Sequence, residues 1–435
     1  MIVHPALPPT FDTRDALEAH HLTALNALLV AQRANAFYRP LIDAAGLQDG
    51  TASLDHFRDV MPLTTKPQIV DDQQRHPPFG RNLSEPVEHY SRLHQTSGTS
   101  GAPLRWLDTP TSWAWMVGNW MQVFVEAGVT PRDRVGFAFS FGPFLGFWTA
   151  FEAATAIGAL SLPAGGMSSA ARLRMLLDNE ATVLCCTPTY ALRLGEVAAA
   201  EGIDLKASKV HRIIVAGEPG GSVPATRNAI EAAWPGARVF DHHGMTEVGP
   251  VSYEHPTQPG MLHIIEAAYI AEIIDPTTTQ PATLGETGEL VLTTLGRTGS
   301  PLIRYRTGDL VKQADATTQN NLGRVDIALV GGVLARVDDM VLVRGVNVYP
   351  SAIDDLIRSL ADVAEYQVVV DEQAAMTELR IRVEPTADAA ASTLAGRVAN
   401  VLRDAMQLRV TVELVPPGEL PRFEMKAQRW IRNTR

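Results

Sequence analysis

The middle of the chain alternates short apolar runs with longer segments in which apolar residues recur at helical spacing. The apolar runs predict strands, and the segments between them predict helices. The expected strands cover 135–139, 160–162, 183–186, 212–216 and 238–240, and the expected helices cover 144–157, 170–177, 189–200 and 223–233. Strands that alternate with helices at this spacing form parallel sheets covered by helices, so the pattern predicts an α/β fold.

The pattern changes on both sides of this region. Before it, leucines at helical spacing predict a helix over 15–37, which leads into Pro-rich, loop-like sequence up to Pro86. After it, residues 261–310 contain strand-like runs, such as 268–274 and 288–294, separated by Gly and Pro turns. This stretch predicts a smaller β-rich subdomain. The polar segment 314–321 predicts an exposed turn.

A separate unit begins at about residue 338. Its predicted elements, in order, are strand 340–343, helix 351–360, strands 365–370 and 378–383, helix 389–406 and strand 409–414. This order describes a compact α+β module. A chain of 435 residues exceeds what one hydrophobic core normally serves. We therefore expect two domains, residues 1–337 and residues 338–435.

Composition and charge exclude several classes of partner. The net charge of -11 leaves no broad basic surface, so no nucleic acid is expected as a partner. No apolar run approaches about 18 residues, so no membrane span is expected. The first residues lack the basic and then apolar order of a secretory signal, and we expect a cytoplasmic protein. The adjacent Cys185 and Cys186 lie in an apolar run and are expected to be buried and reduced.

A run of hydroxyls and glycines follows the strand-like residues near position 94. It consists of Thr96, Ser97, Gly98, Thr99, Ser100 and Gly101. Glycines let successive backbone N–H groups converge on an anion, and hydroxyls add donors or a magnesium ligand. Taken alone, the run favours a polar surface loop, because short clusters of Gly, Ser and Thr are common in loops.

Five further short segments follow this run in order. They are Gly217-Glu218-Pro219, Asp241-His242-His243-Gly244-Met245-Thr246-Glu247, Arg304-Tyr305-Arg306-Thr307-Gly308-Asp309, the stretch from Arg336 to Gly345, and the stretch from Leu420 to Ala427. Each segment alone is weak. The six together and in order resemble the acyl-adenylate-forming superfamily, and specifically its phenylacetate-CoA ligase branch.

The resemblance covers the chain from about residue 25, because Phe37-Tyr38-Arg39-Pro40, Pro62-Leu63-Thr64-Thr65-Lys66 and Gly345-Val346-Asn347-Val348-Tyr349-Pro350 also resemble that branch. It implies a large N-terminal domain with helix-covered parallel sheets and a small, mobile C-terminal lid domain. It also implies that ATP activates a carboxylic acid to an acyl-AMP, which is then passed to coenzyme A. The implied cofactors are ATP, Mg²⁺ and coenzyme A.

The resemblance assigns roles around the phosphates. Residues 96–101 would cradle the β- and γ-phosphates, Thr246 would bond the α-phosphate, and Glu247 would ligate magnesium. A carboxylate oxygen suits this hard ion. Read alone, Thr246 and Glu247 would also fit a pair that caps a helix N-terminus.

The resemblance also assigns the nucleoside site. Gly217, Glu218, Pro219, Asp241, His242, His243 and Gly244 would line the adenine and acyl pockets. The family often has tyrosine where His243 stands, and the two histidines would otherwise simply end a strand. Asp309 would accept the ribose hydroxyls, although Thr307-Gly308-Asp309 also fits an acidic turn.

The C-terminal segments carry three more expected roles. Arg336 would contact ribose or phosphate, and Asp338 would be the hinge about which the lid rotates. Lys426 would bridge the carboxylate and the α-phosphate during adenylation. A solvated basic tail is the alternative for this lysine, because arginines surround it. The family pattern Pro-Arg-x-x-x-Lys, matched by Pro421, Arg422 and Lys426, favours the catalytic role.

The expected acyl pocket consists of Phe141, Gly142 and Ala216 with His243. These residues would form a flat apolar slot, so an aryl or arylacetic acid is the expected substrate, although Phe141 would equally fit a plain core position. The acyl group would alternatively pass to a carrier-protein thiol or an amine. A catalytically degenerate nucleotide-binding protein is a third reading. The family alone suggests a homodimer.

Two positions depart from the family. Many members of the branch hold a structural zinc ion with cysteines, but Glu254-His255 and the cysteine-free stretch 312–325 occupy those regions here, so no zinc is expected. Relatives also often place lysine at the position of Ala102, beside the phosphate-loop run. Another group would therefore have to supply the positive charge that this lysine brings to the phosphates.

Overall fold

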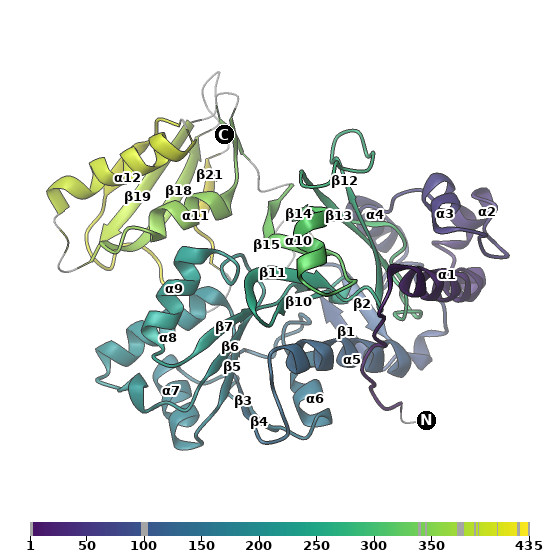
Figure 1. Cartoon of the computed structure of the whole chain (residues 1–435), viewed down its shortest axis with the longest axis horizontal. Coiled ribbons are helices and arrows are strands. Elements are labelled where there is room, and N and C mark those ends of the chain that lie inside the picture. The colour runs from purple at the N-terminus through teal and green to yellow at the C-terminus, as the bar shows by residue number, and fades with distance from the viewer. Residues whose placement is uncertain are drawn as a thin grey trace.

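The structure is a computed structural model of the chain (Figure 1). It describes residues 3–96, 103–337, 341–343, 346–371, 378–386, 389, 391–406, 408–423 and 427–433. Figure 1 shows three parts: helices with a parallel sheet, an antiparallel sheet beside it, and a C-terminal module that lies against helices α8 and α9.

The parallel sheet confirms the predicted α/β fold. Its strands have the order β4-β3-β5-β6-β7 and all pair in parallel. They are β3 (Arg134–Phe137), β4 (Leu160–Pro163), β5 (Val183–Cys186), β6 (Arg212–Val215) and β7 (Arg238–Asp241). The connecting helices are α6 (Trp148–Ala156), α7 (Ser169–Asp178), α8 (Pro188–Ala200) and α9 (Pro224–Ala233), with a short 3-10 turn η3 (Leu205–Ala207) after α8. Parallel strands place their carboxyl ends at one edge, where ligands bind in such folds.

Both cysteines are fully buried in β5, which is the middle strand of this sheet. Burial raises the pKa of Cys185 and Cys186 far above the ordinary thiol range. The thiols therefore stay protonated and pack as small apolar groups, as predicted.

The predicted β-rich subdomain is a six-stranded antiparallel sheet. Its order is β10-β11-β15-β14-β13-β12. The strands are β10 (Ser252–His255), β11 (Gln258–Ile264), β12 (Tyr269–Ile274), β13 (Thr287–Thr294), β14 (Tyr305–Gln313) and β15 (Ala328–Arg336). The turn predicted over 314–321 is wrong in part, because a short helix, α10 (Ala316–Asn321), begins there. The side chain of Asp315 caps it by accepting a hydrogen bond from the backbone N–H of Thr318 at 2.8 Å.

Helix α5 (Pro110–Glu126) was not predicted. It is buried on most sides, as Trp113, Met116, Trp120, Val123 and Phe124 all belong to the main hydrophobic core. A helix that is apolar all round has no amphipathic period to reveal it. Among the described residues, no helix combines the length and apolarity needed to cross a lipid bilayer.

The N-terminal helix is shorter than predicted. Helix α1 (Arg14–Ala31) passes into a 3-10 turn, η1 (Gln32–Ala34), and the chain turns at the buried Asn35. The Asn35 side chain accepts hydrogen bonds from the backbone of Phe37 and Tyr38, both at 3.0 Å, which competes with helix continuation. The stretch expected to be loop contains α2 (Arg39–Ala44), α3 (Leu54–Val60) and α4 (Lys66–Arg75), and the 3-10 turn η2 (Val87–His89) follows it.

The C-terminal module has its own hydrophobic core. Its sheet has the order β20-β19-β18-β21, with helices α11 (Pro350–Arg358) and α12 (Ala391–Met406). The strands are β18 (Val363–Asp371), β19 (Glu378–Pro385), β20 (Thr411–Leu414) and β21 (Trp430–Asn433). The strand predicted over 340–343 lies in a separate hairpin of β16 (Val341–Val343) and β17 (Val346–Val348), and the unpredicted β21 takes its place in the sheet.

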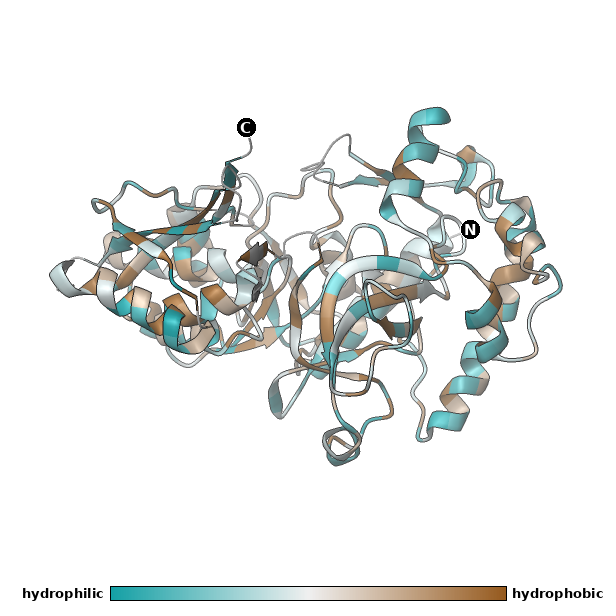
Figure 2. Ribbon diagram, turned by 90° about the horizontal axis from the view of Figure 1, so that it is seen from above, coloured by the Kyte–Doolittle hydropathy of each residue, from teal (hydrophilic) through white to brown (hydrophobic). Residues whose placement is uncertain are grey.

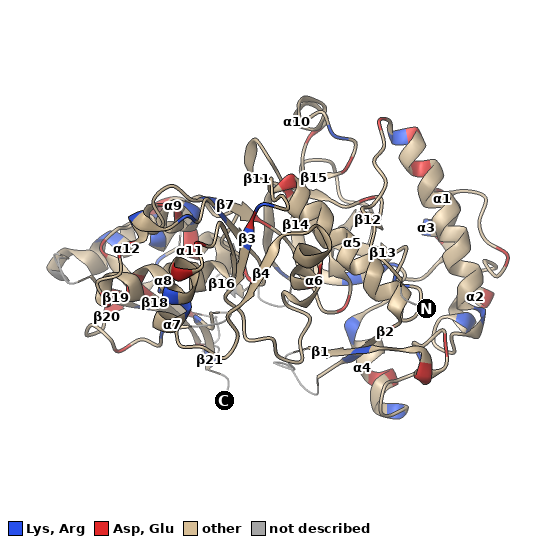
Figure 3. Cartoon of the chain, turned by 90° about the horizontal axis from the view of Figure 1, so that it is seen from below, with Lys and Arg blue, Asp and Glu red and all other residues tan. Residues whose placement is uncertain are grey.

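Side-chain character follows this architecture. Figure 2 shows hydrophobic residues along the strands and hydrophilic residues along the peripheral helices. Figure 3 shows acidic and basic residues interspersed on α1 and on the helices of the C-terminal module. Such mixing agrees with a surface that does not attract polyanions.

Buried histidines make stability depend on pH. His94 lies in β1 (Arg92–Gln95), pairs across the sheet with β2 (Arg105–Asp108), and is 4% exposed. Its ring stacks on Trp113 with centroids 5.2 Å apart. Burial lowers its pKa to about 4. The unfolded imidazole takes up a proton near pH 6.5, whereas the folded one does not, so acidification favours the unfolded chain.

We predict that His94→Phe, which keeps the stacking ring, reduces the loss of unfolding free energy between pH 7 and pH 5 by about 2 kcal/mol. Urea denaturation at both pH values measures this loss. The exposed His56 provides the control, because His56→Gln should leave the pH dependence unchanged. An unchanged pH dependence in His94→Phe would mean that the imidazole is protonated in the folded protein.

Candidate active site

The candidate site begins at the carboxyl edge of the parallel sheet. Asp241 ends β7 and is buried, with its carboxylate accepting hydrogen bonds from the hydroxyl of Ser222 at 2.5 Å and the backbone N–H of His242 at 3.0 Å. Burial raises the pKa of this carboxyl despite those hydrogen bonds. Gly221 lies so close that an added Cβ would meet the Asp241 carboxylate at 2.4 Å. Asp241 therefore holds the loop after β6 against the end of β7.

Thr246 and Glu247 occupy the turn of a small hairpin between β8 (Gly244–Met245) and β9 (Gly249–Pro250). The alternative in which they cap a helix is wrong. Gly249 has a φ of +93°, a conformation that favours glycine in this turn. The Thr246 hydroxyl accepts a long hydrogen bond, 3.4 Å, from the backbone N–H of Leu145.

A buried ion pair anchors this hairpin turn. Arg297 donates to the backbone carbonyls of Thr246 at 2.9 Å and Glu247 at 2.6 Å. The same guanidinium binds both carboxylate oxygens of Asp108 at 2.7 and 2.8 Å, and neither side chain is exposed. The sequence pattern did not indicate Arg297, because its partners lie about 50 and 190 positions away along the chain.

The Glu247 carboxylate faces the ammonium group of Lys66, a residue to which the sequence assigned no role. Lys66 begins α4 and places its ammonium nitrogen 3.2 Å from Glu247 Oε1. The Glu247 side chain is 9% exposed, whereas that of Lys66 is 39% exposed. One hard carboxylate oxygen beside an open edge fits a magnesium ion that takes its other ligands from phosphates and water. The signal for Lys66 was its place in the quoted Pro62–Lys66 segment.

Asp309 joins three of the segments singled out in the sequence. It is a buried residue of β14, not a turn residue, and Arg336 lies opposite it on β15. Arg336 Nη1 lies 2.7 Å from Asp309 Oδ1, and His243 Nε2 lies 2.9 Å from Asp309 Oδ2. The carboxylate is therefore fixed between an arginine and an imidazole, one at each oxygen.

His242 and His243 point to different partners. His243 reaches Asp309, so it does more than end a strand. His242 is 4% exposed, lies 4.2 Å from the Trp120 ring centre, and bonds through Nδ1 to the carbonyl of Ser252 at 2.5 Å. Burial lowers the pKa of His242 to about 3, so this ring is neutral and packs beneath the site.

Phe141 lies in a cluster of aromatic rings. Trp148, Phe139 and Phe151 lie 4.9 to 5.5 Å from its ring centre, each in an edge-to-face arrangement. The ring is half-buried, and its backbone has a φ of +49°. The neighbouring Gly142 accepts a hydrogen bond from the Trp148 indole at 3.0 Å. Ala216 packs as a partly buried residue against the same core.

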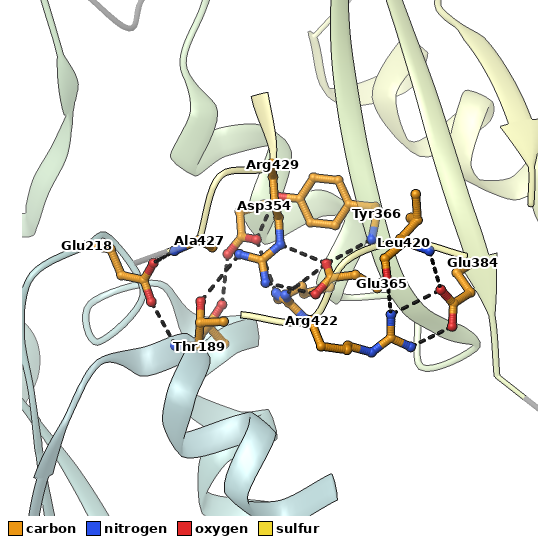
Figure 4. A network of polar contacts seen from close by, with 12 residues as sticks. Thr189, Glu218, Asp354, Glu365, Tyr366, Glu384, Leu420, Arg422, Ala427 and Arg429 are labelled. Atoms are coloured by element: carbon orange, nitrogen blue, oxygen red, sulfur yellow. Dashed lines mark hydrogen bonds and ion pairs between the residues drawn. The ribbon is translucent and has the colours of Figure 1, made fainter. Parts of the chain in front are cut away.

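Several expected site residues lie outside the described part of the chain. They are Ser97, Gly98, Thr99, Ser100, Gly101, Asp338 and Lys426. Their neighbours are described. The Thr96 hydroxyl accepts a hydrogen bond from the backbone N–H of Leu104 at 3.0 Å, which closes the base of the 97–102 segment. The backbone N–H of Ala427, the residue after Lys426, donates to Glu218 (Figure 4).

The region expected to lack zinc is occupied by an ion pair. Glu254 is 2% exposed and binds the guanidinium of Arg227 and the backbone N–H of Gly260 at 2.6 Å. Burial raises the pKa of Glu254 to about 7, although Arg227 opposes this shift. His255 contacts the Leu322 carbonyl at 3.2 Å. No group of three or more metal-binding side chains occurs among the described residues, and the absence of zinc stays a prediction.

We predict that Arg297→Met lowers the free energy of unfolding by about 3–5 kcal/mol, because it leaves the buried Asp108 carboxylate without its cation. Chemical denaturation measures the change. Arg134→Met is the matched control, since Arg134 pairs with Glu180 at an exposed position and its loss should have little effect. Equal effects of the two substitutions would contradict the anchoring role of Arg297.

Known proteins share both the sequence and the fold. Residues 59–296 match the AMP-binding enzyme family, and residues 345–434 match the AMP-binding enzyme C-terminal domain. The phenylacetate-coenzyme A ligase of Thermus thermophilus is 30% identical over 422 residues, covering 89% of each chain. That of Escherichia coli K12 is 30% identical over 411 residues, covering 90% of this chain and 89% of its own.

A solved relative, 2-hydroxyisobutyryl-CoA ligase, matches differently in different states. In its postadenylation state with an acyl-AMP it has a TM-score of 0.89 at 29% identity, covering 96% of this chain and 89% of its own. In its thioesterification state with 2-HIB-AMP and CoA the TM-score is 0.70 at 30% identity, covering 98% and 93%. The chain belongs to the AMP-binding enzyme family, in the phenylacetate-CoA ligase branch that its ordered segments resemble.

Proposed function

We propose that the protein is an AMP-forming acid-CoA ligase with an aryl or arylacetic acid as its substrate. ATP and the acid give an acyl-adenylate and pyrophosphate, and coenzyme A then gives the thioester and AMP. One observation carries the proposal: segments far apart in sequence, at 241–247, 309 and 336, meet at the carboxyl edge of the parallel sheet around Asp309.

The first half-reaction brings two anions together, so the site must supply positive charge and fixed geometry. Glu247 would hold Mg²⁺, which neutralises phosphate charge when it is bound. Lys66 lies at the same carboxylate and supplies a second cation on the open side. A lysine there offsets the missing charge at Ala102, and its ammonium group binds phosphate as a point charge.

The nucleoside would bind along β14 and β15. Asp309, whose carboxylate contacts His243 and Arg336, would accept the ribose hydroxyls, which suits an acceptor-only group. Because both oxygens are already held, the carboxylate needs little reordering when the ribose arrives. Thr246 would bond the α-phosphate from the hairpin turn, with Gly217, Glu218, Pro219 and Gly244 beside the base.

The aromatic cluster around Phe141 favours a ring-bearing acid. Flat rings pack edge to face on such clusters, and the Phe144 ring lies against Gly142, where an added Cβ would meet it at 2.7 Å. Similar chains use different acids, since the relatives are ligases of phenylacetate and of 2-hydroxyisobutyrate. We place the domain boundary at 337/338, with rotation at Asp338 between the two half-reactions.

We predict that the protein exchanges labelled pyrophosphate into ATP only when a suitable acid is present. A panel of arylacetic, benzoic and short alkyl acids should give the fastest exchange with arylacetic or aryl acids. Thioester formation with coenzyme A is then measured on the same acids. Exchange without a CoA thioester would favour a carrier-protein thiol or an amine as acceptor. A folded sample that binds ATP and exchanges with no acid would contradict the function.

For Lys426→Ala we predict a loss of acid-dependent exchange of at least about a hundred-fold, because charge stabilisation by one group is worth this much in transition states. Thioester formation from supplied acyl-AMP and coenzyme A should remain largely unchanged. The exposed Lys206 is the matched control, and Lys206→Ala should alter neither reaction. Equal losses in both half-reactions would contradict a lysine that serves adenylation alone.

A further inference from the structure

Glu218 binds α8 of its own domain through one carboxylate oxygen and the C-terminal module through the other (Figure 4). We propose that Glu218 is a positioning residue that holds the C-terminal module at Ala427, the residue after Lys426, for adenylation and must release it before thioester formation. This inference rests on the proposed function, in which Lys426 serves the first half-reaction. It gives Glu218 a role beyond that of a wall of the adenine pocket.

The contact is a two-sided bridge between backbone groups. Glu218 Oε1 accepts a hydrogen bond from the backbone N–H of Thr189 at 2.9 Å, and Oε2 accepts one from the backbone N–H of Ala427 at 2.7 Å. Thr189 is the second residue of α8, where the helix dipole favours a negative charge. Gly217 precedes the bridge with a φ of +96°. Hydrogen bonds to an ionised acceptor are stronger than neutral ones.

The bridge acts close to Lys426. Ala427 follows Lys426 directly in the sequence, and its amide is fixed by Glu218. Ala427 also precedes β21, which is paired in parallel with β18. Ala427 is therefore held between a sheet of the module and a loop of the large domain.

Arg429 makes a second connection to the same helix. Its guanidinium binds the Glu365 carboxylate at 2.7 and 3.1 Å, and Nη1 lies 3.4 Å from the hydroxyl of Thr189. Thr189 therefore meets the large domain's Glu218 through its amide and the module's Arg429 through its hydroxyl. The Arg429 side chain is 10% exposed, so water screens this contact little.

Arg422, which precedes residues 424–426, also lies near helix α8. Arg422 binds the Glu384 carboxylate at 2.5 and 3.0 Å, and its Nε lies 3.9 Å from Glu196 on α8. The closer pair lies within the module, and the longer one reaches the large domain. Both flanks of residues 424–426 thus lead to α8, but Glu218 makes the short contact to the adjacent backbone.

The two states of the solved relative indicate which pose this contact belongs to. The chain matches the postadenylation state with a TM-score of 0.89 and the thioesterification state with 0.70, over nearly the same share of residues. The relative is the same in both comparisons, so this chain matches its postadenylation state better than its thioesterification state. The Glu218 bridge needs the module against α8, so a rotation that carries the module away breaks it.

Glu218→Gln tests the inference, because the amide keeps the size of the side chain but offers only one acceptor atom. One of the two backbone N–H groups then faces an NH₂ group. We expect kcat for acid-dependent pyrophosphate exchange to fall about ten-fold, as losing one charge-assisted hydrogen bond predicts. The KM values for ATP and acid should stay within about two-fold, and thioester formation from supplied acyl-AMP should be unchanged or faster.

Glu201→Gln is the matched control, since Glu201 follows α8 at its other end and pairs with Arg174 at the surface. It should behave as the unmodified protein does. Equal loss of both half-reactions with a raised KM for ATP would overturn the inference and leave Glu218 as a wall of the adenine pocket. Exchange at the unmodified rate in Glu218→Gln would also overturn it.

A second readout does not depend on activity. Trypsin cleavage after Arg422, Lys426 and Arg429, followed by mass spectrometry, should be faster in Glu218→Gln than in the unmodified protein and in Glu201→Gln. Unchanged cleavage would overturn the inference. If the unmodified protein exchanges with no acid, the proposed function fails, and this readout still decides whether Glu218 holds the module at Ala427. Equal thermal melting of the variants shows that the fold is intact.

Discussion

The Asp108–Arg297 ion pair is the contact on which the geometry of the candidate site depends. Both side chains are wholly buried, and taking two charges out of water costs several kcal/mol unless the geometry is good. Here the pair is bidentate, and the remaining donors of Arg297 bind the Thr246 and Glu247 carbonyls. A cost of this size is tolerated where it fixes one arrangement of the chain.

That arrangement links the two phosphate-binding candidates. Asp108 ends β2, the strand that follows the segment 97–102, and Arg297 holds the hairpin turn that presents Glu247. The strand after the hydroxyl-rich run and the turn that carries Glu247 are therefore both attached to the same buried ion pair. On the open side, each of two carboxylates has a cationic partner: Glu247 meets Lys66, and Asp309 meets Arg336, with His243 at its other oxygen.

The sequence predicted elements whose ends carry local signals. The strand at 183–186 agrees with β5 residue by residue, and α8 begins one residue earlier than predicted because Thr187 caps it and Pro188 fills its first position. Helix α5 was not predicted because apolar residues lie all around it and leave no amphipathic pattern. The roles of Arg297 and Lys66 were not predicted for another reason. Their partners are distant in sequence, and no local pattern encodes such a contact. The ordered segments predicted residues that line the candidate site, but they did not predict the Asp108–Arg297 ion pair beneath it.

The Gly-Glu-Pro segment shows why a motif assignment by itself leaves a residue's physical role open. Resemblance implied that Glu218 lines the pocket of the base, whereas the fold turns both of its oxygens toward backbone N–H groups of two different domains. A bridge of two hydrogen bonds is strong enough to bias a lid and weak enough to break in each cycle, since its loss changes an equilibrium by about ten-fold per 1.4 kcal/mol. A stronger, fully buried pair such as Asp108–Arg297 would hold the lid permanently in one half-reaction. The molecule thus uses a buried ion pair where the geometry must persist and a partly exposed carboxylate bridge where it must change.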